Sequence, residues 1–356
     1  MDNLDRKIKI LCIGDPHFKI SNIIEMTKLS KDIVEHAKTI KPDFIVCLGD
    51  VLDRHSNIHV TPLTLSTKFL KDLTLISELF IVIGNHDRPN NSNFCTDEHP
   101  FTACKYWNNC NVIDSPKIFH RYEHEFLFVP YVPPGRIREA FALLGEDFTI
   151  SNITCVFAHQ EFYGAKMEEG IVSKNGDHWP KTYPLCISGH IHHYDDLQPN
   201  LIYVGTPLQH EYSDTTDKSI SLFTFDQNKD FIHDRIFLDL LRKYILYIRP
   251  QEIISYQPPD NVSLIMIITG TQIEIDACKK ISRIKEFLKM GIQVKYKTIL
   301  DSADNITDIH SNKINPVQTY LSCIYSNIEK ENVDDECRQR ILNWYADLFG
   351  QTQKKS

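Results

Sequence analysis

Ile81-Val82-Ile83-Gly84-Asn85-His86-Asp87 is the stretch that decides the fold of this chain. Three apolar residues that favour strands lead into a glycine, which is followed by an amide, an imidazole and a carboxylate. This order predicts a buried strand that ends in a tight glycine turn and presents polar side chains at the sheet edge. Ligands of open α/β sheets bind at the carboxyl ends of the strands, so we expect a functional site there. Asn85 offers a metal ion an amide oxygen, and His86 offers a group for proton transfer.

The same order, an apolar run and then a residue that can bind a metal, occurs four more times in the chain. The runs span residues 8–13, 44–48, 153–158 and 185–188, and the polar residues that follow them are Asp15 and His17; Asp50, with Asp53 and Arg54 three and four positions later; His159; and His190 and His192. Apolar spacing predicts helices at 23–40 and 63–79, between the first three strands. Alternating strands and helices indicate an α/β sheet, and we expect the strand ends to converge.

The converging strand ends supply two carboxylates, four imidazoles and one amide. The seven residues are Asp15, His17, Asp50, Asn85, His159, His190 and His192. Such a mixture of oxygen and nitrogen ligands suits Mn, Fe or Zn, and it is too large for a single cation. Two ions ~3.5–4 Å apart would hold both the attacking and the leaving oxygen of an in-line displacement. The set therefore predicts a hydrolytic centre that uses two divalent ions.

This ordered series of motifs resembles the calcineurin-like metallophosphoesterase superfamily over roughly residues 8 to 226. Within it the chain is most similar to the SbcD-type DNA-repair nucleases and their phage recombination relatives. The stretches that carry this finer resemblance are Gly84-Asn85-His86-Asp87, Phe157-Ala158-His159-Gln160-Glu161 and Tyr203-Val204-Gly205-Thr206-Pro207-Leu208. One position departs from many repair nucleases, which carry His where this chain has Asp53. Asp53-Arg54 is instead similar to the phosphatase pattern, in which the arginine binds phosphate.

The resemblance implies an α/β fold, a two-sheet metallophosphoesterase sandwich with four layers (αββα), a small α/β capping domain and C-terminal helices. It implies that one ion is bound by Asp15, His17, Asp50 and His192. The other would be bound by Asp50, Asn85, His159 and His190, so that Asp50 bridges the two. His86 would protonate the leaving sugar oxygen, and Asp87 would orient His86. Mn²⁺ is the first expectation for the two divalent metal ions, with Fe²⁺, Mg²⁺ or Zn²⁺ as alternatives.

Four segments are expected along the chain. They are a metallophosphoesterase domain at 1–237, a capping domain at 238–300, a linker at 301–315 and a helical segment at 316–356. In the capping domain a single helix at 273–290 would carry Lys279, Lys280, Arg283 and Lys289 on a face that either contacts DNA phosphates or is simply solvated. The two amphipathic helices of the last segment either dock on a partner or fold back on the core.

The leading functional hypothesis is a manganese-dependent nuclease that acts on DNA ends. Its expected partners are DNA, an SMC-like ATPase bound through the C-terminal helices, and a second copy of the chain in a homodimer. The first alternative is a phosphomonoesterase or protein phosphatase that uses Arg54 to bind phosphate. A second alternative is a catalytically idle scaffold that presents the C-terminal helices to the ATPase.

Composition limits the compartment more than the activity. The 356 residues are 42% hydrophobic and 24% charged, which is typical of a globular protein. No apolar signal segment opens the chain, and the longest aliphatic run, 264–268, is too short to cross a bilayer. The ten cysteines include no CxxC pair, which favours reduced thiols. We therefore expect a cytoplasmic or nuclear protein that is neither secreted nor membrane-bound. The net charge of −8 decides little about nucleic-acid binding.

Overall fold

A computed structural model describes residues 6–55, 57–167 and 171–299. The chain divides into two units, Met1–Thr298 and Ile299–Ser356, and the first contains every element described below. The linker expected at 301–315 and the C-terminal helices expected at 316–356 lie outside the described residues. Within the described ranges, no helix is long and apolar enough to span a membrane.

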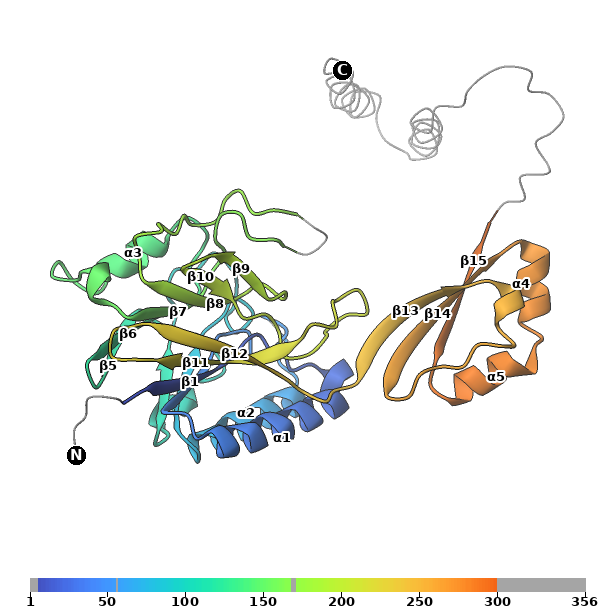
Figure 1. Ribbon diagram of the computed structural model, residues 1–356, viewed down its shortest axis with the longest axis horizontal. Coiled ribbons are helices and arrows are strands. Elements are labelled where there is room, and N and C mark those ends of the chain that lie inside the picture. The colour runs from blue at the N-terminus through green and yellow to red at the C-terminus, as the bar shows by residue number, and fades with distance from the viewer. Residues whose placement is uncertain (1–5, 56, 168–170, 300–356) are drawn as a thin grey trace, which may run out of the picture. The chain divides into compact units, whose positions relative to one another are not determined.

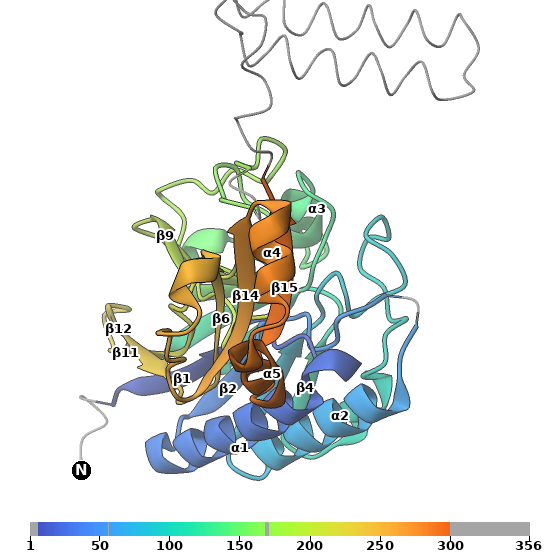
Figure 2. The same ribbon diagram turned by 90° about the vertical axis from the view of Figure 1, so that its right-hand side faces the viewer.

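The first sheet has six strands in the order β12-β11-β1-β2-β3-β4. Its strands are β1 (Ile8–Ile13), β2 (Phe44–Cys47), β3 (Glu78–Val82), β4 (Cys110–Ile113), β11 (Ser219–Phe225) and β12 (Phe231–Phe237). Strands β1 to β4 are parallel, and β11 and β12 continue the sheet in antiparallel pairing. Helices α1 (Ile23–Ile40) and α2 (Val60–Thr74) lie side by side along the outer face of this sheet (Figures 1 and 2).

The second sheet also has six strands, in the order β5-β6-β7-β8-β10-β9. Its strands are β5 (Lys117–Arg121), β6 (His124–Val129), β7 (Cys155–His159), β8 (Leu185–Gly189), β9 (Asp195–Gln198) and β10 (Leu201–Tyr203). The central strands β6, β7, β8 and β10 are parallel. The short helix α3 (Ile137–Ala142) packs on its outer face through Ile137 and Phe141.

A phenylalanine-rich core joins the two sheets face to face. Alternate residues of β1 point to opposite sides, so Ile10 contacts this inner core whereas Leu11 packs against the helices. Phe80 of the first sheet stacks on Phe128 of the second with ring centroids 4.2 Å apart. Each buried phenylalanine side chain contributes about 1.5–3 kcal/mol through its removal from water. The expected sandwich of helix, sheet, sheet and helix layers is thereby confirmed.

A separate three-stranded parallel sheet follows, with the order β13-β14-β15. Its elements are β13 (Arg242–Ile248), β14 (Val262–Gly270), α4 (Gln272–Cys278), α5 (Ser282–Lys289) and β15 (Gln293–Thr298). Buried residues of α4 and α5 form a single apolar cluster with this sheet, here called the small sheet, and both helices cover the same face of it (Figure 2). Four short 3-10 helices complete the described elements: η2 (Ile20–Asn22), η3 (Thr102–Tyr106), η4 (Ile150–Asn152) and η6 (Pro250–Glu252).

The prediction of a single helix at 273–290 is wrong. The segment forms two helices, because Ile281 adopts an extended conformation (φ −69°, ψ 131°) and serves as the N-cap of α5. Two cations of the expected basic face also pair with neighbouring acids. Lys279 pairs with Asp276 at 3.0 Å, and Arg283 pairs with Glu286 at 2.7 Å.

Candidate metal centre

Loops that leave five strands bring all seven predicted ligand residues to one region at the carboxyl ends of the parallel strands. Several of these loops turn through the left-handed region, with φ of 46° at His17, 46° at Asp50 and 82° at His190. Non-glycine residues in this conformation cost roughly 1–3 kcal/mol each and cluster at functional sites. The backbone is therefore strained at three of the residues that the sequence singles out.

One half of the cluster is organised around Asn85. Its Oδ1 lies 3.0 Å from His159 Nε2 and 3.0 Å from His190 Nδ1. Asp50 Oδ2 lies 3.3 Å from His159 Nε2. His159 Nδ1 donates to the Leu48 carbonyl oxygen at 2.7 Å, so its Nε2 faces the cluster as the atom available to a cation. Ligand atoms of Asp50, His159 and His190 all lie within 4.8 Å of one another, which is the spacing of a metal site.

The other half of the cluster contains Asp15, His17 and His192. His17 Nε2 lies 3.1 Å from His192 Nε2 and 3.8 Å from Asp50 Oδ2. Asp15 Oδ2 accepts a hydrogen bond from the His190 backbone N–H at 2.9 Å. Asp15 Oδ1 is buried and makes no hydrogen bond, although His159 Nδ1, which donates to Leu48, lies 3.3 Å away. A buried carboxylate oxygen without a donor is costly, and a bound cation would satisfy it. This orphaned oxygen and the mixed O/N donor set fit divalent metal ions.

The charges of the cluster favour the ligand forms of Asp50, His17 and His190. Burial alone would raise the pKa of Asp50, but the imidazoles of His159 and His17 hold it well below its usual range. Burial, with the neighbouring His159, lowers the pKa of His190 to about 3. Burial also lowers the pKa of His17 well below its ordinary value. At neutral pH Asp50 is therefore anionic while His17 and His190 are neutral, which are the forms that bind cations. His159 differs: burial alone would lower its pKa, but the Asp50 and Asp15 carboxylates raise the pKa of His159 well above its ordinary value, so a cation at Nε2 would have to displace a proton.

His86 lies beside this cluster and is held by the main chain of a neighbouring loop. Its backbone N–H donates to Asp50 Oδ1 at 2.8 Å, and its Nδ1 donates to the Asp53 carbonyl oxygen at 2.7 Å. The His55 ring stacks on it with centroids 4.8 Å apart. The ring is thereby fixed in position and in tautomer.

Asp87, which was expected to orient His86, bonds to the main chain of two loops. Its carboxylate accepts hydrogen bonds from the backbone N–H groups of Val51, Leu52 and Gly84, at 3.2, 3.0 and 3.2 Å. Burial and the adjacent Asp50 charge raise the pKa of Asp87 to about 7. Asp87 thus joins the loops after β2 and β3, and the Asp53 carbonyl orients His86 in its place.

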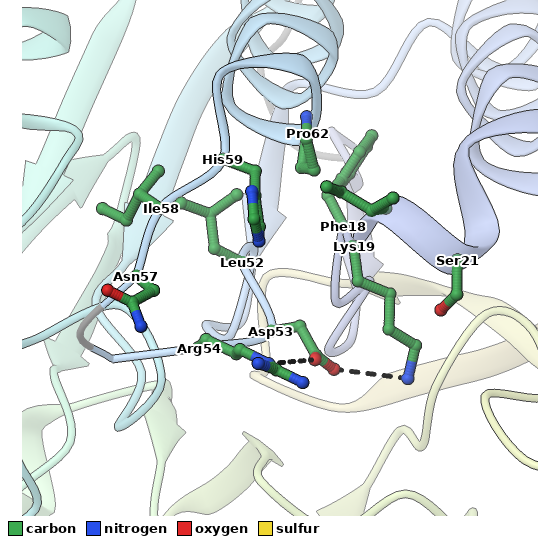
Figure 3. A pocket seen from close by; sticks show the side chains of 11 residues that line it. Phe18, Lys19, Ser21, Leu52, Asp53, Arg54, Asn57, Ile58, His59 and Pro62 are labelled. Carbon is green, nitrogen blue, oxygen red and sulfur yellow. Dashed lines mark ion pairs between the residues drawn. The ribbon is translucent and has the colours of Figure 1, made fainter.

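Asp53 and Arg54 form a local ion pair, but only Asp53 reaches the cavity over the cluster. Asp53 lines a cavity of about 570 Å³ together with His17, Asp50 and His86. Arg54 is absent from that lining, and its side chain is 72% exposed. It lies instead on a neighbouring cavity, with its Nε 4.0 Å from Asp53 Oδ2 (Figure 3).

Comparison with known proteins agrees with this geometry. Residues 8–194 match the family model described as calcineurin-like phosphoesterase. The chain belongs to the calcineurin-like phosphoesterase family. It is 34% identical to Putative phosphoesterase 078R of Invertebrate iridescent virus 3, over 82% of this chain and 85% of that protein. It is 39% identical to Putative phosphoesterase 244L of Invertebrate iridescent virus 6, over 64% of this chain and 78% of that protein.

Among solved structures, the similarity is weaker. GAP50, described as the anchor in the inner membrane complex of Plasmodium, matches with a TM-score of 0.38 and 12% identity. The match covers 83% of this chain and 98% of that chain. Family membership therefore rests on the family model and the two viral relatives. It makes the chain a phosphoester hydrolase, and calcineurin-like phosphoesterases use divalent metal ions.

Glycines explain how the family's strand-end motifs can pack so closely. A Cβ at Gly84 would lie 2.2 Å from Asp50 Oδ1, and one at Gly49 would lie 2.3 Å from His159 Nδ1. Gly49 also has a φ of 107°. Only glycine fits both positions, because any side chain there would displace a residue of the cluster.

One residue of this calcineurin-like centre was not predicted from the sequence. His210 is buried, and its Nε2 donates to the Asp15 carbonyl oxygen at 3.0 Å. Its ring lies 4.9 Å from the His17 ring, centroid to centroid. The available signal was its place after β10, which is one more parallel strand whose carboxyl end meets the same edge.

Proposed function

We propose that the chain is a phosphodiesterase that hydrolyses DNA with two divalent ions, Mn²⁺ in the first instance. Phosphoester hydrolysis follows from the family; the DNA substrate is the proposal. Two-ion hydrolysis is supported by the convergence of Asp50, Asn85, His159 and His190 beside a separately oriented His86. The preference for a diester such as DNA is supported by the position of Arg54 outside the cavity over the cluster.

The two halves of the cluster would hold one ion each. Asp15, His17, Asp50 and His192 would hold the first, and Asp50, Asn85, His159 and His190 the second. When bound, the pair supplies positive charge to the scissile phosphate and makes a water nucleophile available at neutral pH. Fe²⁺, Mg²⁺ and Zn²⁺ suit the same mixture of ligands and are the alternatives to test.

His86 is suited to protonate the leaving oxygen. Because its Nδ1 donates to the Asp53 carbonyl, Nε2 is the atom that gains and loses a proton. A departing sugar alkoxide needs that proton, and a positioned acid contributes ~10²–10⁴-fold to such a step. Asp53 thus acts through its main chain, and Asp87 acts by fixing the loop that carries His86.

The position of Arg54 favours a diesterase over a phosphatase. An arginine that grips a phosphomonoester has to reach the phosphate, whereas Arg54 lines the neighbouring cavity and not the one over the cluster. The cavity over the cluster, at about 570 Å³, has room for a phosphate and the sugars on both sides of it.

A nuclease assay tests the proposal. Labelled single-stranded and duplex DNA are incubated with Mn²⁺ or with chelator, and p-nitrophenyl phosphate and phosphopeptides are tested in parallel. We expect Mn²⁺-dependent cutting of DNA. Turnover of the monoesters alone, lost in Arg54→Ala, would replace the proposal with the phosphatase alternative.

A variant separates chemistry from metal binding. His86→Ala is expected to lower the rate of DNA cutting ~10²–10⁴-fold while bound metal, measured by elemental analysis, stays unchanged. The matched control is His120→Ala, because His120 is an exposed histidine of β5 with a 67% exposed side chain. Loss of metal in the first variant would overturn the role assigned to His86.

We also propose, from the resemblance to the SbcD-type nucleases, that residues 316–356 bind an SMC-like ATPase and that the chain forms a homodimer. Co-purification of the ATPase with the full chain, and its loss on deletion of 316–350, is the expected result. Sedimentation of the same two samples measures the oligomeric state.

A further inference from the structure

A second cavity adjoins the one over the metal-ligand cluster, and nothing said so far assigns it a role. It has a volume of about 250 Å³. Lys19 and Asp53 line both cavities, so the two share a wall. We call the second cavity the side pocket. Figure 3 shows Asp53 between Lys19 and Arg54 along one side of it, with Phe18, Leu52 and Pro62 opposite.

The interior of the side pocket is apolar. Phe18 and Leu52 are 1% and 3% exposed and form part of the core, so this wall is rigid. Ile58 is 43% exposed and stands where the pocket opens to solvent. The hydroxyl of Ser21 and the amide of Asn57 also line the pocket. An occupant therefore needs apolar faces and a few polar atoms at its edge.

The charges at the pocket form ion pairs. Lys19 Nζ lies 3.4 Å from Asp53 Oδ1 and 3.5 Å from Glu211 Oε1. Arg54 Nε lies 4.0 Å from Asp53 Oδ2. The lining itself holds the two cations and Asp53, whereas Glu211 lines the adjoining cavity. Both cations are already paired with a carboxylate, which favours a neutral occupant over a phosphate.

Hydrogen bonds connect the wall of the side pocket to the metal-ligand cluster. Asn22 Nδ2 donates to the His17 carbonyl at 3.0 Å, and its Oδ1 accepts from the Lys19 N–H at 3.0 Å. The turn that carries His17 into the cluster thus also fixes Lys19 in the shared wall. On the same wall the Asp53 carbonyl holds His86, the proposed proton donor to the leaving oxygen. The side pocket consequently lies on the side of the leaving group.

We infer that the side pocket binds the nucleobase of the leaving nucleoside, the one that departs with a free hydroxyl at the cut bond. This inference rests on the proposed DNA hydrolysis. A neutral planar heterocycle matches the apolar walls and the polar rim. The volume of about 250 Å³ is below the ~300–1,000 Å³ of sites that take a whole ligand, which suits one base of a longer substrate.

The test uses trithymidylate whose central base has been removed. At one of its two linkages the abasic residue is the leaving nucleoside, and at the other it keeps the phosphate. Products of short incubations with Mn²⁺ are identified by mass, so each linkage reports separately. We expect the linkage with the abasic leaving nucleoside to be cut about tenfold more slowly than in intact trithymidylate, the effect of about 1.4 kcal/mol of lost contact. The other linkage should stay within about twofold.

A pocket-filling variant and a matched control complete the experiment. Ile58→Trp places a large side chain in the mouth of the pocket without touching the proposed ligands. Compared with the wild type, this variant should cut intact trithymidylate about tenfold more slowly. It should cut the linkage with the abasic leaving nucleoside at the wild-type rate. The control is Ile24→Trp, since Ile24 is 87% exposed and is not among the pocket residues; it should behave as the wild type.

The outcomes separate this inference from the function on which it rests. Two outcomes would overturn the assignment of the side pocket while leaving the nuclease proposal in place. One is that the wild type cuts both linkages of the abasic trinucleotide as fast as those of intact trithymidylate. The other is that Ile58→Trp still cuts the linkage with the abasic leaving nucleoside about tenfold more slowly than the intact one. If the wild-type chain with Mn²⁺ cuts neither trithymidylate nor longer DNA, the nuclease proposal fails and the inference falls with it.

Discussion

Parallel strands end at polar residues both in the sandwich and in the small sheet, yet these polar residues are used differently. In the small sheet they bond to close neighbours: the Arg249 N–H donates to Glu252 at 2.8 Å, and the Thr271 N–H donates to Glu274 at 2.9 Å. In the sandwich the partners come from distant strands, as where Asp15 accepts from the His190 N–H, 175 positions along the chain.

A functional site differs from a capped strand end in where its polar side chains find their partners. A carboxylate that finds its donors within one turn is satisfied locally and stays near solvent. Asp50 is buried among imidazoles from two other strand ends, and Asp15 keeps a buried oxygen that makes no hydrogen bond. A bound cation would offset the cost of this arrangement, because buried charge without enough partners is unfavourable.

The largest expected effect comes from removing the charge that both halves of the cluster share. Asp50→Asn keeps the shape of the side chain but supplies no anion, so we expect bound metal to be lost and hydrolysis to fall below detection. Metal content and hydrolysis are measured on the same sample. Asp114→Asn, at the end of β4 in the same sheet, is the control and should retain both.

A pair of glycine substitutions sharpens the comparison. In Gly84→Ala the new Cβ would lie 2.2 Å from Asp50 Oδ1 and 2.3 Å from the Asp50 backbone nitrogen, so the site has to move. We expect activity to be lost and the free energy of unfolding to fall by about 1–3 kcal/mol.

In the small sheet the same substitution is expected to be mild. For Gly270→Ala the nearest atoms are Glu274 Oε2 at 3.0 Å and Pro250 Cγ at 3.1 Å, so the neighbours need to move by only a few tenths of an ångström. The change in unfolding free energy should be at most about 1 kcal/mol, with activity unchanged. Equal costs in denaturant melts of the two variants would show that the strand ends of the sandwich are no more tightly packed than those of the small sheet.

The fold of the sandwich was predictable where strands are buried on both faces. β1, β2, β3, β7 and β8 are continuous apolar runs, and each precedes one of the quoted polar motifs. β12 was missed because it is an edge strand that alternates between exposed and partly buried residues and includes His233, Asp234 and Arg235. Its position is set by pairing with β11, which the local sequence pattern does not predict.

The split of the expected helix at 273–290 has a similar cause. Ala277, Ile281, Ile284 and Leu288 keep a helical spacing, yet one extended residue at Ile281 shifts the register. After the break Phe287 is buried, whereas Leu288 is 55% exposed. Periodicity is insensitive to a single residue that leaves the helix, because the apolar residues on either side still fit the pattern.

The convergence of the seven predicted residues was foreseeable because a strand end fixes where its next few residues lie. His210 and Lys19 were harder to foresee, because a place after a strand that ends at this edge does not fix where residues farther along the loop lie. His210 reaches Asp15 only because the chain after β10 folds back over the first strand end, and Lys19 faces Asp53 only through the turn held by Asn22. Both depend on tertiary contacts between loops, for which a single sequence carries no spacing rule.

A cap substitution tests the local nature of the small sheet's strand ends. Thr271 Oγ1 accepts from the Glu274 N–H at 3.3 Å as the N-cap of α4. Thr271→Ala should cost about 1 kcal/mol of stability. Hydrogen exchange should rise in α4 alone, with bound metal and hydrolysis unchanged, and Thr271→Ser should restore protection. A fall in hydrolysis would contradict the view that this end is only a cap.

The smallest expected effect concerns Asp114, which follows β4 of the first sheet but is satisfied locally. Burial alone would raise its pKa, but hydrogen bonds from His99 and Lys105 lower the pKa of Asp114 to about 2. A carboxyl group whose pKa is lower in the folded than in the unfolded state stabilises the protein at pH values above its unfolded pKa, here 3.8. This contribution disappears as the pH falls toward 2.

Asp114→Asn should therefore lower the free energy of unfolding by somewhat less than about 1 kcal/mol at pH 6, since solvent screens a partly exposed group. The variant and the wild type should converge near pH 2 in unfolding measured by denaturant at a series of pH values. A difference that persists there would mean that Asp114 acts through packing rather than charge, and that even this strand end is built more like the one at Asp50 than like those of the small sheet.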